Sequence, residues 1–139
     1  MRVVLDTNVL LSALISPYGP PDKIYRAWRA ARFDLVTSIA QLDELRRVSR
    51  YPKLKAILPP HRVGAMVNNM QRAVTLKYLP NLPEDVEFGD PNDAFLFTMA
   101  LAGEVDYLVT GDRRAGLLQR GSAGRARIVT PSIFCTEAL

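Results

Sequence analysis

Short apolar runs alternate with longer segments of helical pattern along almost the whole chain of 139 residues. The apolar runs predict strands at residues 2–5, 34–38, 106–110 and 126–130, with a short edge strand at 77–80. The segments between them predict helices at 9–15, 21–32, 39–50, 52–58, 60–75 and 91–103, a short helix from about 113, and a last one at 131–139. Such alternation is typical of an α/β fold around a mostly parallel sheet.

The composition narrows the class of protein further. No repeat, low-complexity tract or long linker divides the sequence, so we expect one domain over residues 1–139. The chain has neither a secretory pattern at its start nor a run of roughly 20 apolar residues, so we expect no membrane association. Cys135 is the only cysteine, which suits the reducing cytoplasm. Because His61 is the only histidine, zinc sites built from Cys and His, and mechanisms with two histidines, are excluded.

One carboxylate stands where an apolar residue would be expected. Asp6 ends the first predicted strand and precedes a second apolar run at 9–15. A carboxylate between two buried segments costs several kcal/mol unless something compensates it. Asp6 therefore either caps the following helix or binds a ligand.

Further acids also stand at the end of a predicted strand or at the start of a predicted helix. Asp112 comes just after the predicted strand 106–110, while Asp90 and Asp93 stand at the start of the predicted helix 91–103. Each has a purely structural interpretation as a helix cap or as an acid that suits the helix dipole. In an α/β sheet, however, ligands gather beyond the carboxyl ends of the strands, where these acids would converge. Converging carboxylates repel one another unless a cation holds them.

The predicted helix 39–50 contributes one more acid. With about 100° per residue, its apolar residues form a stripe centred near Leu45, and Asp43 points almost directly away from that stripe. We therefore expect Asp43 to be exposed. Glu44 flanks the stripe, so of the two adjacent acids it is the one that can face the interior edge of the fold.

The ordered motifs of the chain resemble a known family. LDTNVLLSAL, an ELRRV helix, DPNDAFLFTMALAG and DYLVTGD occur in this order, and together they are similar to the PIN domain over essentially the whole chain. Within that family the chain resembles the toxin components of bacterial toxin–antitoxin pairs, the VapC-like ribonucleases. The resemblance implies a three-layer α/β/α sandwich with a parallel sheet. It also implies four acidic metal ligands, a further acid and two supporting polar positions: Asp6, Glu44, Asp93 and Asp112; Asp90; Asn8 and Thr110.

The expected chemistry follows from the ligand type. Clustered carboxylates without His or Cys select hard cations, so we expect Mg²⁺ or Mn²⁺. Such an ion activates water and offsets charge on a phosphate. The expected activity is hydrolysis of RNA to give 5′-phosphate ends, as the resemblance to PIN nucleases also implies. Asp6 and Asp112 are expected to hold the main ion, with Asp93 sharing it or holding a second ion and Glu44 orienting water.

Charge and resemblance suggest the partners. The net charge is +4, with 14 Arg and 4 Lys, which suits a polyanion. Arg46, Arg47 and Arg113 stand next to the predicted acids and are candidates for binding RNA phosphates, although an ordinary solvated helix face explains them equally well. RNA is expected only through the resemblance, which also suggests an antitoxin protein as partner and a homodimer as a possible assembly.

Other classes of protein fit less well. A phosphatase of the haloacid dehalogenase type needs a second Asp two residues after the first, and here that place is Asn8. A receiver domain needs an early aspartate pair, which is missing. A PIN-shaped binding module with little turnover stays open as an alternative, as does a housekeeping RNA-processing nuclease. A metal-dependent nuclease assay separates the first of these from an enzyme.

Overall fold

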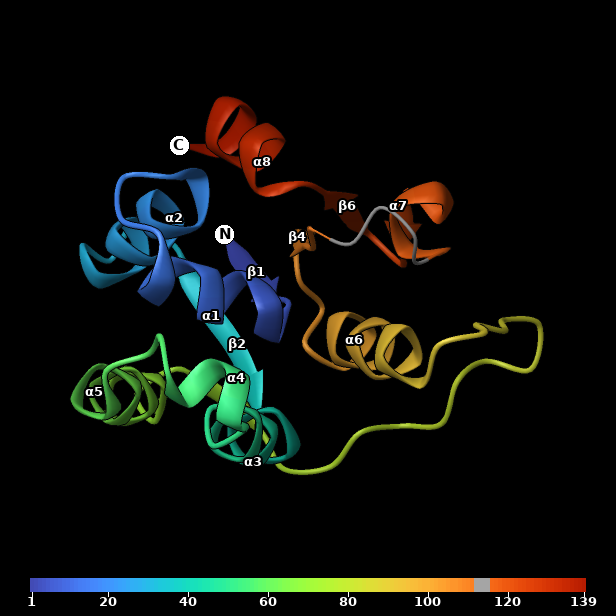
Figure 1. Ribbon diagram of the computed structural model, residues 1–139. Coiled ribbons are helices and arrows are strands. Elements are labelled where there is room, and N and C mark those ends of the chain that lie inside the picture. Colours follow the sequence, from blue (N-terminus) through green and yellow to red (C-terminus); the bar gives the residue numbers. More distant parts are fainter. Residues whose placement is uncertain (112–115) are drawn as a thin grey trace.

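The computed structural model describes residues 1–111 and 116–139 and contains one mixed sheet with helices around it (Figure 1). The strands are β1 (Arg2–Leu5), β2 (Asp34–Ser38), β3 (Val74–Leu76), β4 (Tyr107–Val109), β5 (Ser122–Ala123) and β6 (Ala126–Val129). They lie in the order β3-β2-β1-β4-β6-β5. Every pairing is parallel except that of β5 with β6. The predicted mostly parallel sheet is confirmed.

The helices cover both faces of this sheet. They are α1 (Thr7–Ile15), α2 (Pro20–Arg29), α3 (Ile39–Val48), α4 (Pro52–Lys55), α5 (Pro60–Met70), α6 (Pro91–Ala102), α7 (Gly116–Arg120) and α8 (Pro131–Ala138). Within the part of the chain that the structure describes, none of them is long and apolar enough to cross a bilayer.

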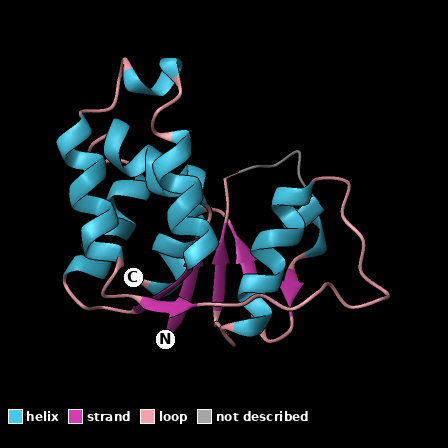
Figure 2. Ribbon diagram, turned by 90° about the horizontal axis from the view of Figure 1, so that it is seen from below, coloured by secondary structure: helices cyan, strands magenta, loops and turns pink. Residues whose placement is uncertain are grey.

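The alternation of side chains along β1 separates two apolar cores. Val3 and Leu5 belong to a core with α1, α2, α3, α5 and α8, whereas Val4 belongs to a core with α6 and α7. Successive side chains of a strand point to opposite faces, so a strand buried on both sides is apolar throughout. Figure 2 shows the two groups of helices on either side of the strands. The predicted three-layer α/β/α sandwich is confirmed.

The strand order places a crevice beside β1. From β1 the chain passes outward to β2 and β3, and from β4 it passes to β6 on the other side. The segments that follow β1 and β4 therefore leave their adjacent carboxyl ends in opposite directions. In open parallel sheets this switch point is where ligands bind. Asp6 follows β1 and Thr110 follows β4, so both stand at the switch point.

The chain after residue 70 differs from the prediction. We predicted a helix over 60–75 and an edge strand at 77–80, but α5 ends at Met70 and β3 comes earlier than expected. In β3, Val74 pairs in parallel with Val36 of β2. The pattern of α5 was extended too far because the β-branched residues of β3 satisfy an apolar helical spacing, while their shape favours a strand once a neighbouring strand is available.

Smaller differences occur elsewhere. β5 was not predicted, because two residues carry too little pattern to indicate a strand. The helices predicted at 39–50 and 52–58 are shorter than expected and correspond to α3 and α4. The predicted start of a helix near 113 lies outside the described residues, and α7 is described from Gly116.

Asp106 ties the first residues of β1 to the loop before β6. One of its carboxylate oxygens accepts the backbone N–H of Arg2 at 2.8 Å, and the other accepts Nη2 of Arg125 at 2.8 Å. The hydrogen bond from Arg2 is the main cause that lowers the pKa of Asp106. Desolvation raises this pKa, and the charge of Arg125 lowers it. Because the folded pKa is the lower one, the charged carboxylate stabilises the fold at neutral pH, and this contribution is lost as the pH falls below 3.8 towards the folded value.

We predict that Asp106→Asn lowers the free energy of unfolding at pH 7 by roughly 0.5–1 kcal/mol, the range for partly exposed charged pairs. At pH 3 the difference between variant and wild type should be smaller, since Asp106 of the unfolded wild type is then largely protonated. Urea unfolding at both pH values measures it. An equal difference at pH 7 and pH 3 would contradict this role of the charge.

Candidate active site

The Asp6 carboxylate is buried at the point where β1 ends and α1 begins. Only 2% of the residue is exposed. Its Oδ1 accepts the backbone N–H of Asn8 at 3.1 Å, so Asp6 is the N-cap of α1. Its own backbone N–H donates to the carbonyl of Val109 at 2.9 Å, which joins the ends of β1 and β4. The capping interpretation is therefore correct for these contacts, which also hold the carboxylate at the switch point between β1 and β4.

Thr110 holds the same carboxylate from the β4 side. Its hydroxyl donates to Oδ2 of Asp6 at 2.8 Å, and the residue is fully buried. The two oxygens of Asp6 are thus oriented by two separate elements. Asn8, the other polar position that the resemblance indicates, has an exposed side chain and lines a cavity of about 360 Å³ together with Ser12 and Gly111.

The acids of α6 divide into a cap and a buried carboxylate. Asp90 is exposed and accepts the backbone N–H of Asn92 at 2.9 Å, which makes it the N-cap of α6. Asp93 lies in the first turn of α6 and is only 3% exposed. Both acids line a cavity of about 560 Å³ beside α7. A charge as deeply buried as that of Asp93 requires compensation, whereas that of Asp90 does not.

Glu44 and Asp43 face different surroundings, as predicted. The side chain of Asp43 is 70% exposed and pairs with Arg46 at 3.3 Å. Glu44 is half-buried, and its pKa is raised by desolvation and then by the charge of Asp6, while Arg47 and a hydrogen bond with Thr7 lower it. Two carboxylates from β1 and α3 are therefore close enough to repel each other.

A single amide side chain joins α3 to the end of β1. The Ser38 hydroxyl accepts the backbone N–H of Gln41, as expected of a helix start. The Gln41 side chain, however, turns inward: its Nε2 donates to the carbonyl of Leu5 at 2.7 Å, and its Oε1 accepts the Thr37 hydroxyl at 2.7 Å. Gln41 thereby sets the distance between Glu44 and Asp6. No pattern in the sequence indicates this tertiary role of Gln41.

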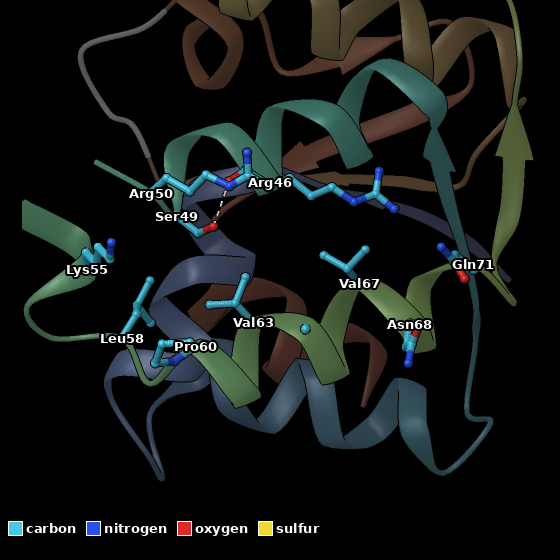
Figure 3. A pocket seen from close by; sticks show the side chains of 11 residues that line it. Arg46, Ser49, Arg50, Lys55, Leu58, Pro60, Val63, Val67, Asn68 and Gln71 are labelled. Atoms are coloured by element: carbon cyan, nitrogen blue, oxygen red, sulfur yellow. Dashed lines mark hydrogen bonds between the residues drawn. The ribbon is translucent and has the colours of Figure 1, made fainter. Parts of the chain in front are cut away.

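The predicted phosphate-binding arginines Arg46 and Arg47 line different cavities. Arg47 lines a cavity of about 360 Å³ with Glu44 and with Pro91 and Asn92 of α6. Arg46, one residue further back on α3, instead lines a separate groove between α3 and α5 (Figure 3). Arg113 lies outside the described residues. Of the two arginines that are described, Arg47 is the one beside a candidate acid.

The complete acidic set is not contained in the described residues. Asp112, predicted as a principal ligand, lies outside them, although Thr110 and Gly111 before it follow β4 as expected. Among residues 1–111 and 116–139, no three acidic, histidine or cysteine side chains are gathered closely enough to form a metal site by themselves. The described part brings Asp6 and Glu44 into electrostatic contact and places Asp93 in the first turn of α6, whose N-terminus borders the cavity that Glu44 lines.

The fold and the site define an α/β protein with acidic side chains near the switch point of its sheet. Comparison with known proteins gives its family. The PIN domain model matches residues 2–114, so the chain belongs to the PIN domain family. The fold is similar to that of a chain in the crystal structure of VapBC2 from Rickettsia felis bound to a DNA fragment from their promoter. That similarity has a TM-score of 0.56 and 16% identity, and covers 94% of this chain and 98% of that one. No curated protein matches this chain.

We predict that Thr110→Val destabilises the protein by about 1–2 kcal/mol, because it withdraws a hydrogen-bond donor from a buried carboxylate. Thr110→Ser keeps the hydroxyl and should recover most of this loss. Chemical denaturation of the three proteins at pH 7 is the measurement. If valine and serine variants unfold at the same denaturant concentration, the hydrogen bond to Asp6 does not contribute as stated.

Proposed function

We propose that this chain is a metal-dependent ribonuclease that hydrolyses RNA phosphodiester bonds and leaves 5′-phosphate ends. The observation that carries the proposal is the electrostatic contact of buried Asp6 with half-buried Glu44 at the switch point of the sheet. Membership of the PIN domain family supports a nuclease in general. A half-buried acid whose pKa is raised by burial and by a neighbouring carboxylate, as that of Glu44 is, is a common mark of a functional site.

The donor set fits a hard divalent cation. The candidate ligands offer only carboxylate oxygens, and the single His61 and Cys135 stand elsewhere in the sequence. Oxygen ligands of this kind suit Mg²⁺ or Mn²⁺. A cation would also relieve the repulsion that raises the pKa of Glu44. The residues that would hold it are Asp6, Glu44, Asp93 and Asp112, with Asp90 as a further candidate.

The protein's own residues position the reaction. When bound, the ion supplies an activated water and neutralises charge on the phosphate. Thr110 keeps the Asp6 carboxylate in one orientation, and Glu44 orients the attacking water. Water attacks phosphorus and the bond to the 3′ oxygen breaks. The upstream fragment then ends in a 3′-hydroxyl, and the phosphate stays on the 5′ oxygen of the downstream fragment.

The biological setting is part of the proposal. VapBC2 from Rickettsia felis, which shares the fold, is seen in a complex bound to promoter DNA. For this chain we propose the role of the toxin of a type II toxin–antitoxin pair, with an antitoxin protein as partner. A housekeeping RNA-processing nuclease is the second candidate. A small open reading frame next to this gene that encodes a DNA-binding protein favours the first role, and its absence favours the second.

We predict Mn²⁺- or Mg²⁺-dependent cleavage of a mixed RNA pool, with 5′-phosphate ends and no cleavage in EDTA. Asp6→Asn, Asp93→Asn and Asp112→Asn, and separately Glu44→Gln, should each lower the rate by about 10²-fold or more, since each removes a charge from the reacting centre. End mapping of the products and initial rates measure this. Products with 2′,3′-cyclic phosphate would show that the RNA supplied the nucleophile and would refute the mechanism.

Asp43→Asn is the matched control for Glu44→Gln. It removes the neighbouring charge from the same helix, but its side chain is exposed and paired with Arg46. We expect it to cleave RNA at nearly the wild-type rate. Equal loss in both variants would assign the effect to the general charge of α3. A wild-type protein that binds RNA but does not cleave it with either metal would favour the binding module.

We predict further that Mn²⁺ raises the Tm of the wild type by mass action on the folded state, and that it does so much less for Asp6→Asn. Asn caps a helix about as well as Asp, so the capping contribution should persist in the variant. Thermal melts of both proteins with Mn²⁺ and with EDTA test it. If Mn²⁺ changes the Tm of neither protein, Asp6 is only a helix cap.

A further inference from the structure

A second cavity lies on the side of α3 away from Glu44. It is a groove of about 420 Å³ between α3 and α5, closed at one end by the segment around α4 (Figure 3). Its floor is aliphatic, made by the buried side chains of Leu58, Val63 and Val67. None of these residues belongs to the acidic crevice, so the groove is a separate feature of the surface.

The charge of the groove has one sign. Its lining includes Arg46, Arg50 and Lys55, and no acidic residue lines it. Arg46 is paired with Asp43, but no carboxylate of the described residues is in ion-pair contact with Arg50 or Lys55. The other polar side chains of the lining are hydroxyl and amide groups, on Ser49, Asn68 and Gln71. An apolar floor under unpaired cations suits an anionic ligand with an apolar part.

A glycine in the middle of α5 opens this groove. Gly64 is exposed and lines the groove, and a Cβ added to it would meet nothing within 4 Å. Neither crowding nor a left-handed backbone therefore calls for glycine here. Inside a helix glycine costs about 1 kcal/mol relative to alanine. Gly64 therefore does not stabilise the fold. Its missing side chain leaves space for a ligand to lie against the backbone of α5.

We propose that this groove holds a nucleotide of the RNA strand away from the cleaved bond, with its base against Gly64 and the aliphatic floor and its phosphates on Arg50 and Lys55. The proposal rests on the proposed ribonuclease function, which supplies the polyanion. Amides such as those of Asn68 and Gln71 can donate to and accept from base edges. The groove is thus a binding site for single-stranded RNA, and its depth and amides bear on sequence preference.

The cations of α3 connect the groove to the acidic crevice. With about 100° per residue, Arg46 and Arg47 of α3 are separated by an arc of about 100°, and Arg50 lies in the turn just after the helix. Arg47 lines the cavity of Glu44, and the other two line the groove. A strand that crosses α3 along this arc passes from one cavity to the other with a cation near its phosphates throughout.

The test measures binding of a short fluorescein-labelled single-stranded RNA by anisotropy, in EDTA so that no cleavage intervenes. Gly64→Ala should raise the Tm by about 3 °C through helix propensity and yet weaken RNA binding about threefold. Gly64→Leu should weaken binding about tenfold. The double variant Arg50→Ala/Lys55→Ala should also weaken it about tenfold, and lower the salt slope by about 0.7 for each phosphate that the variant no longer neutralises.

Two control variants match these changes outside the groove. Ala65→Leu adds nearly the same bulk, one carbon less, at an exposed neighbour on α5, and Arg72→Ala/Lys77→Ala removes the same charge. We expect both to bind RNA nearly as the wild type does. If Gly64→Leu binds RNA as well as Ala65→Leu does, or if the two double variants lose equal affinity, the groove is not an RNA site and the proposal is overturned.

The alternative to RNA as the ligand of this groove is a partner protein. If Gly64→Leu keeps RNA binding but loses binding of an amphipathic peptide of Glu and Leu, the groove docks a protein and the proposal is likewise overturned. The outcomes also distinguish this inference from the proposed function. Metal-dependent cleavage by the wild type with unimpaired binding in the groove variants refutes the groove alone, while absence of any cleavage refutes the ribonuclease.

Discussion

The burial of the Asp6 carboxylate at the end of β1 is the constraint on which the site depends. A buried charge has to be satisfied, and here the backbone of α1 and the hydroxyl of Thr110 approach it from two sides. These contacts require β1 and β4 to be neighbours, and the backbone bond from Asp6 to Val109 joins them at that point. The capping role and the proposed ligand role of Asp6 are compatible, because capping orients the carboxylate that a cation would use.

The position of α3 follows from a second buried polar contact. Gln41 connects the carbonyl of Leu5 to the Thr37 hydroxyl, so α3 starts at a defined place beside the crevice. From there Glu44 faces Asp6, and Arg47 balances part of the charge. Arg46 of α3 and Arg50 of the turn after it border the groove with α5. One helix thereby separates the acidic side chains of the site from the cationic groove.

The family assignment and the local chemistry support each other at different levels. The PIN domain match covers residues 2–114, which include the first four strands and the acidic motifs. The similarity to a chain of the Rickettsia felis VapBC2 complex covers 94% of this chain, at an identity that speaks for architecture only. The proposal of metal-dependent RNA cleavage rests on the acidic residues, on the raised pKa of Glu44 and on membership of the PIN domain family. The proposed antitoxin partner rests on the resemblance to toxin–antitoxin proteins.

The sequence by itself determined the layered fold, because strands such as β1 are apolar on both faces and that pattern is compatible only with a covered parallel sheet. It also identified Asp6 and Asp93 as acids in apolar surroundings, and it separated Glu44 from Asp43 by helical spacing alone. Tertiary structure alone decided the end of α5, since β3 exists only where β2 offers a partner. It likewise decided the inward turn of Gln41 and the groove around Gly64. These depend on contacts between segments far apart in the chain, and no local pattern contains them.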